Sequence, residues 1–159
     1  METGTLTFDN LNNTLYSFVT DFVETYKSLL IRDGKNPKGD LIRTLKPIGI
    51  EFTSNQMSGS INIVDYWKYV EYGRRPGKFP PPNAILEWVK TRPVLPRAKN
   101  GLKPPTDKQI SFLVSRKISE KGIAAGNQYT KALDICWNRW KDKIEEAVSQ
   151  DIQNYLDTI

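Results

Sequence analysis

The first patterned stretch of the chain runs from Thr14 to Arg32, where apolar side chains recur every three or four positions. This spacing predicts an amphipathic helix with one buried face. The pair Asp33-Gly34 predicts its end, because glycine adopts the left-handed conformation at a helix C-terminus at little cost. The next residues, 35–46, are rich in turn formers and predict a connection.

From residue 48 to residue 64 the apolar period changes from three or four to two. This alternation predicts an antiparallel hairpin in which Ile48, Ile50 and Phe52 lie on the half-buried face of the first strand. Gly59, in the second strand, predicts a bulge or a close approach of another segment to the backbone.

The middle of the chain predicts short helices separated by proline-rich loops. Tyr66, Tyr69 and Trp88 fall at helical spacing, so we expect them to pack in the core. Prolines 80–82 fix an extended loop before a helix over residues 83–90. Residues 91–105 read as a basic loop punctuated by prolines. Thr106 and Gln109 form a capping box that predicts the start of the next helix. The apolar stripe of this helix is expected at Ile110, Leu113, Val114 and Ile118. Gly122 predicts its end.

The last element is predicted to be a long C-terminal helix over residues 130–158, roughly 40 Å long. Its expected buried stripe consists of Leu133, Trp137, Trp140, Ile144, Val148, Ile152, Tyr155 or Leu156, and Ile159. The whole chain, residues 1–159, is thus predicted to be one α+β domain. A small antiparallel sheet (the hairpin over 48–64, with room for further strands) is flanked by an N-terminal helix, short middle helices and the long C-terminal helix. A helix of that length would extend past the sheet or clasp a neighbouring molecule.

Composition narrows the chemistry. The chain has 159 residues, of which 38% are hydrophobic and 26% charged, which suits a folded domain. It contains no histidine, so His-based acid–base catalysis, Ser-His and Cys-His nucleophiles and His-ligated zinc are excluded. The single cysteine, Cys136, can form no internal disulfide and is expected to pack as a small core residue. No carboxylates converge and no phosphate-binding glycine loop is present, so we expect no enzyme, no cofactor and no metal. A carboxylate–metal nuclease is the enzymatic alternative, with no residue set to nominate.

Charge is distributed unevenly along the chain. Residues 68–121 contain thirteen basic and four acidic side chains, whereas the remainder contains ten basic and fourteen acidic ones. Such asymmetry predicts two different neighbours, and the basic loops suit either an acidic protein surface or phosphates. A basic nucleic-acid-binding accessory protein is therefore an alternative function, although no sequence-specific DNA-binding module fits. The basic residues expected to act as an interface are Arg74, Arg75, Lys78, Arg97, Lys99 and Lys103.

One stretch carries a family resemblance: Tyr69-Val70-Glu71-Tyr72-Gly73-Arg74-Arg75-Pro76, followed by Phe79-Pro80-Pro81 and a helix with Trp88. Gly39-Asp40-Leu41 precedes the hairpin in the same order, and Arg116-Lys117-Ile118 lies in a later helix. Over residues 14–123 the chain resembles the small neck proteins of tailed bacteriophages, the tail-completion and head–tail joining family. It departs from them in the basic loop at 91–105 and in the length of the last helix, which leaves long-tailed and short-tailed phages both open.

The resemblance implies a structural virion protein without catalysis. It would form a ring of identical copies between the portal or adaptor and the tail proteins, and phage DNA would pass through the lumen without sequence-specific binding. Its implied locations are the neck or tail of the virion and, during assembly, the host cytoplasm, with no membrane association. The segment Arg74–Lys103 would face a neighbour or the lumen, and Glu71 would accept a salt bridge from a nearby arginine. From the apolar patterns of their helices, and independently of the resemblance, Trp88, Trp137 and Trp140 are expected to be structural.

Overall fold

The computed structural model describes residues 6–34, 39–53, 56–91 and 103–158. In these ranges the chain forms six helices and a two-stranded antiparallel sheet, so the mixed α+β class is confirmed. The chain divides into two compact units. One, the long-helix unit, is Met1–Trp67 with Asn127–Ile159, and the other, the basic unit, is Lys68–Gly126.

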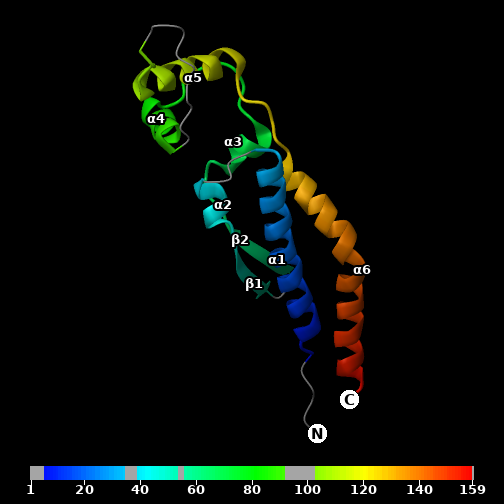
Figure 1. The fold of residues 1–159 in the computed structure, drawn as a ribbon. Helices are drawn as coiled ribbons and strands as arrows, with labels where there is room; N and C mark the ends of the chain where they lie inside the picture. The colour runs from blue at the N-terminus through cyan, green and yellow to red at the C-terminus, as the bar shows by residue number, and fades with distance from the viewer. Residues whose placement is uncertain (1–5, 35–38, 54–55, 92–102, 159) are drawn as a thin grey trace. The chain divides into compact units, whose positions relative to one another are not determined.

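In the long-helix unit, α1 (Asp9–Arg32) lies between the hairpin and α6 (Gln128–Leu156), as Figure 1 shows. The predicted helix at 14–32 is confirmed, but it begins earlier, at Asp9. Residues 9–13 are mostly Asn and Asp, which favour helices weakly, and a contact from α6 described below stabilises this first turn. The short helix α2 (Asp40–Thr44) occupies part of the predicted connection, and Leu41 within it and Leu45 directly after it are fully buried.

The hairpin pairs β1 (Lys46–Thr53) with β2 (Gln56–Asn62). An irregularity between Pro47 and Gly49 leaves Ile48 without an opposite residue, which shifts the alternation. Ile48 is therefore 65% exposed, and its predicted burial is wrong. The predicted burial of Phe52 is also wrong, since this residue is exposed near the end of β1. The close approach predicted at Gly59 is confirmed, because a Cβ added there would lie 2.6 Å from Cγ2 of Val19 on α1.

The core of the long-helix unit is built on α1. Val23, Tyr26 and Leu30 are almost completely inaccessible to solvent. Tyr129 of α6 adds an aromatic cluster, with its ring centroid 5.0 Å from that of Phe22 and 5.6 Å from that of Tyr26. These large side chains of α1 fill the space between the two long helices.

The buried face of α6 differs from the predicted stripe. Its buried residues include Ala132, Cys136, Ala147 and Asp151, whereas Trp137 is 53% exposed. Leu133, Ile152 and Leu156 are exposed as well. The large side chains of α1 occupy the interface, so α6 approaches it with small residues and leaves its large ones outside.

The basic unit contains the helices α3 (Trp67–Tyr72), α4 (Pro82–Thr91) and α5 (Asp107–Lys121). The first residue of α3, Trp67, belongs to the long-helix unit. The capping box at Thr106 is confirmed, as is the helix end at Gly122. A backbone bridge joins Arg74 to Ile123. The glycines beside it, Gly73 and Gly122, have φ of 70° and 72°, and a side chain on either would meet the opposite backbone.

Three aromatic residues expected in the core are exposed: Tyr66, Tyr69 and Trp88. On α4 the buried apolar residue is Val89, and on α5 it is Ile110, while Leu113 of the predicted α5 stripe is exposed. Two helices packed on each other have one shared interior side, which is too narrow to cover every apolar residue that helical spacing assigns to a core.

Candidate interaction surfaces

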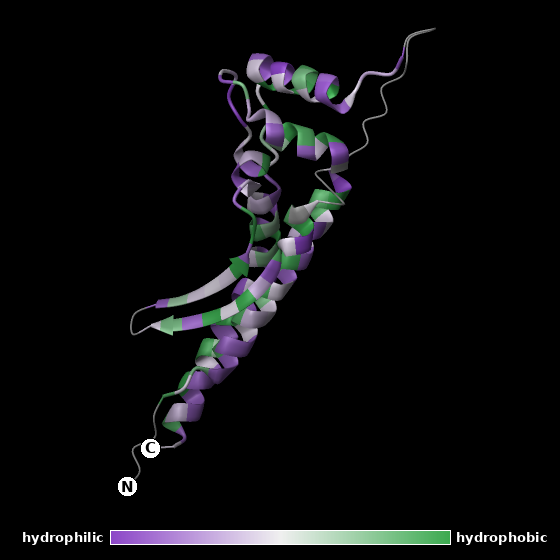
Figure 2. Ribbon diagram, turned by 90° about the vertical axis from the view of Figure 1, so that its left-hand side faces the viewer, coloured by the Kyte–Doolittle hydropathy of each residue, from purple (hydrophilic) through white to green (hydrophobic). Residues whose placement is uncertain are grey.

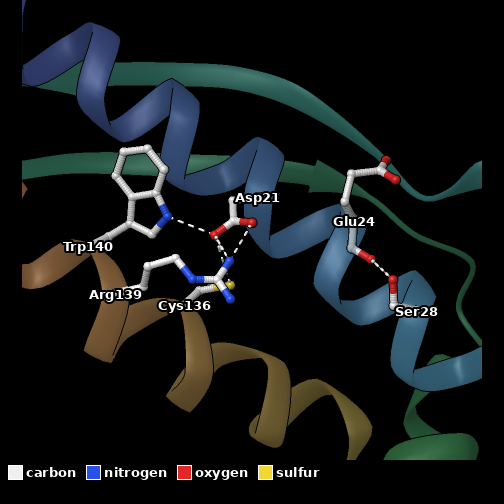
Figure 3. Close-up of polar contacts among 6 residues, drawn as sticks. All are labelled: Asp21, Glu24, Ser28, Cys136, Arg139 and Trp140. Carbon is white, nitrogen blue, oxygen red and sulfur yellow. Dashed lines mark hydrogen bonds and ion pairs between the residues drawn. The ribbon is translucent and has the colours of Figure 1, made fainter. Parts of the chain in front are cut away.

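An aspartate at the middle of α1 joins it to α6 (Figure 3). Asp21 accepts a hydrogen bond of 2.7 Å from Nε1 of Trp140 and two, of 2.7 and 2.8 Å, from Nη1 of Arg139. Sγ of Cys136 lies 3.8 Å from the same carboxylate. Burial alone raises the pKa of Asp21, but the bonds from Trp140 and Arg139 outweigh it and hold that pKa below its usual value. Burial raises the pKa of the Cys136 thiol, so the cysteine packs in the interior as a protonated group.

A second aspartate, Asp151 of α6, caps the N-terminus of α1. Its carboxylate accepts from the backbone N–H groups of Asn10 (3.1 Å) and Leu11 (2.9 Å) and from Nδ2 of Asn10 (2.8 Å). At the opposite end of α1, Nε2 of Gln128 donates to Asp33 at 3.2 Å. Polar contacts at both ends and in the middle thus fix the antiparallel register of the two helices.

This register determines which face of α6 remains uncovered. The exposed or half-buried large side chains follow helical spacing along one side, and we call this side the α6 outer face: Leu133, Trp137, Ile144, Val148, Ile152 and Leu156. Trp140 lies beside it, half-buried through its bond to Asp21, with Nζ of Lys143 4.4 Å from its ring centroid. Trp140 thus contributes to the contact between α1 and α6, whereas Trp137 lies on the surface.

The basic unit has a groove of about 260 Å³ between α4 and α5, here called the α4–α5 groove. Phe79 and Phe112, both exposed, line it and contact each other, with ring centroids 5.9 Å apart and planes tilted by 32°. Ser115 is 3% exposed, and its Oγ has no hydrogen-bond partner among the described residues. The lining residues are Phe79, Pro82, Asn83, Leu86, Lys108, Ser111, Phe112 and Ser115.

The predicted basic residues differ in their accessibility. Arg74 is half-buried and its Nη2 donates to the backbone oxygen of Lys78 at 2.7 Å, so it braces the loop. Arg75, Lys78 and Lys103 are exposed. Arg97 and Lys99, with most of the predicted loop at 91–105, lie outside the described residues.

Glu71, expected to be structural, is fully buried, and its pairing with an arginine stays a prediction. No signal in the sequence indicated the α4–α5 groove. Phe112 precedes Leu113 of the predicted stripe, so helical periodicity placed it on the solvent side and gave no signal for a groove. Ser115 carried no signal either, because a serine in a helix is usually solvated.

Hydrophobic and hydrophilic residues alternate along the helices (Figure 2), and none of those described is long and apolar enough to cross a membrane. Within the described ranges, no group of three or more Cys, Asp or Glu side chains is placed to hold a metal ion. Comparison with protein-family models, with curated proteins and with solved structures finds no match for this chain.

Proposed function

We propose that this chain is a structural protein of a tailed bacteriophage, which assembles with copies of itself into a ring at the head–tail junction. The ring lies between the portal or adaptor and the tail proteins, and DNA passes through it without being read. The protein acts by surface complementarity and catalyses no reaction. The resemblance of residues 14–123 to phage neck proteins supplies the place in the virion.

The observation that carries the proposal is the presence of two uncovered apolar surfaces in regions of opposite charge. The α6 outer face belongs to the unit with an excess of acidic residues, and the α4–α5 groove belongs to the basic unit. A ring of identical subunits requires two different, complementary surfaces on each copy, because every contact is head-to-tail. Uncovered apolar surfaces of this kind mark protein–protein contacts.

Exposed basic residues contribute the electrostatic part of the interface. Arg75 and Lys78 are exposed, so changing both to glutamate leaves the fold intact. We expect the Arg75→Glu, Lys78→Glu variant to stay monomeric where the parent forms rings, because a like-charged contact replaces an attractive one. The matched control changes two exposed lysines of the other unit, Lys46→Glu with Lys131→Glu, and should assemble as the parent does.

The experiment is light scattering of the purified protein over a concentration series, with electron microscopy of the product and antibody labelling of virions. The proposal expects closed rings of one copy number and label at the neck or tail. A protein that stays monomeric at every concentration and is missing from virions would contradict it.

The nucleic-acid-binding alternative is favoured by one feature, the exposed aromatic residue Tyr69 in the basic unit, which offers a face for base stacking. It predicts tight binding of nucleic acid by the isolated monomer, with an affinity that falls steeply as salt rises. Weak binding without that steep dependence favours the ring.

A further inference from the structure

We infer that the α4–α5 groove of one copy receives the α6 outer face of the next copy, with Trp137 as the inserted side chain. The inference rests on the proposed ring and names the contact that builds it.

The groove suits a single side chain. Its volume of about 260 Å³ is below the range of pockets that bind cofactors and drug-sized ligands. Its walls are largely apolar, with Phe79, Phe112 and Leu86 among them. It also contains one buried polar group that lacks a partner, the hydroxyl of Ser115. A matching occupant is therefore a large aromatic side chain that carries a hydrogen-bond donor.

Trp137 has these properties. It is 53% exposed on the α6 outer face, and its indole N–H makes no hydrogen bond to the described residues. Tryptophan offers one donor and a large apolar surface, and such side chains commonly anchor protein interfaces. Within the groove its N–H would donate to Oγ of Ser115 and its rings would pack against Phe112.

Charge supports the same pairing. Asp134 and Glu145 are exposed on α6 beside the outer face, with one cation, Lys141, one turn from Trp137, and Lys108 lines the groove. On a larger scale, the groove belongs to the basic unit and the helix to the acidic one. The opposite net charges of the two units favour this orientation over groove-to-groove pairing, which would bring two basic units together.

The contact is heterologous, so an open assembly keeps one free groove at one end and one free helix face at the other until the ring closes. This gives a sharp test with two variants. Phe112→Asp disables the groove, and Trp137→Asp disables the helix face. Both residues are more than half exposed, so both variants should fold as the parent does, which circular dichroism checks.

Each variant alone should be monomeric by light scattering, and an equimolar mixture should form dimers and nothing larger, because one intact groove meets one intact helix face. The matched controls are neighbouring exposed residues off the two surfaces, Leu113→Asp and Ile135→Asp, which should assemble as the parent does. Adding Ser115→Ala to the Trp137→Asp partner should weaken the mixed dimer about 2- to 10-fold, the effect of one lost neutral hydrogen bond.

The outcomes separate the two proposals. If the parent forms rings but the Phe112→Asp or Trp137→Asp variant assembles equally well, the ring stands and the groove–helix contact is wrong. A mixture that remains monomeric also overturns the contact, since it shows that the two surfaces do not bind each other between copies. A parent that never associates overturns both.

Discussion

Replacing Asp151 with alanine should destabilise the pair of long helices. The residue before α1, Phe8, has no side-chain group that can cap the helix, and its side chain makes no capping bond. The second and third residues of the helix, Asn10 and Leu11, therefore depend on Asp151 for the acceptor that an N-cap side chain normally supplies. The cap comes from another helix, 140 positions away in the sequence.

The expected loss of unfolding free energy follows from the backbone N–H groups that Asp151→Ala leaves without an acceptor. Losing an N-cap acceptor costs about 0.5–2 kcal/mol, and each buried donor left without a partner costs about 1–3 kcal/mol. Asp151 is only 3% exposed, so water replaces it poorly. We expect Asp151→Ala to lower the free energy of unfolding by about 2–4 kcal/mol, a large share of the stability of a domain. Asp151→Asn keeps one acceptor oxygen but loses the charge, and should cost about 1–2 kcal/mol.

Urea unfolding followed by circular dichroism measures both values, and Asp142→Ala is the control, because Asp142 is an exposed aspartate on the same helix. If Asp151→Ala unfolds at the same urea concentration as the control, Asp151 does not cap α1 in solution. The effect also depends on pH. Burial raises the pKa of Asp151, but its bonds to Leu11 and Asn10 outweigh this and lower the pKa. The stabilisation is thus complete above about pH 4 and disappears as the pH falls through the lowered pKa. The Asp151→Asn variant should lose less stability in that acid range than the parent.

Two further substitutions probe the same unit. Gly59→Ala should lower the free energy of unfolding by about 1–3 kcal/mol, because the new methyl group would clash with Val19. The control Gly49→Ala places its methyl group in open space and should change the stability little. Equal melting temperatures for the two variants would contradict the close approach at Gly59. In a double-mutant cycle by urea unfolding, Asp21→Asn and Arg139→Gln should show a coupling energy of about 0.5–1.5 kcal/mol, because Asp21 is partly buried and its pair with Arg139 is less screened than a surface pair. A coupling of zero would mean that the hydrogen bond from Trp140 alone maintains this contact.

Local sequence signals predicted the elements of the fold well. The helical period of α1, the alternation of the hairpin, the capping box at Thr106 and the long helix α6 each depend on residues that are close together in the chain. Helix propensity, capping and turn formation act over a few residues, so they can be recognised without knowing what packs on them. The close approach at Gly59, predicted there as an alternative to a bulge, belongs to the same class, because a glycine inside a strand carries its own signal.

The face that α6 buries was decided by the tertiary structure. The chain offers two stripes on this helix, the large residues around Trp137 and the small ones around Ala132 and Cys136. The choice depends on the shape of α1 and on where Asp21 and Asp151 find their partners. Those partners are more than a hundred positions distant, and nothing local identifies them. Sequence periodicity therefore determined that α6 is amphipathic. Packing against a bulky neighbour determined which side is inside, because close-packed helices exclude volume that the sequence pattern does not encode.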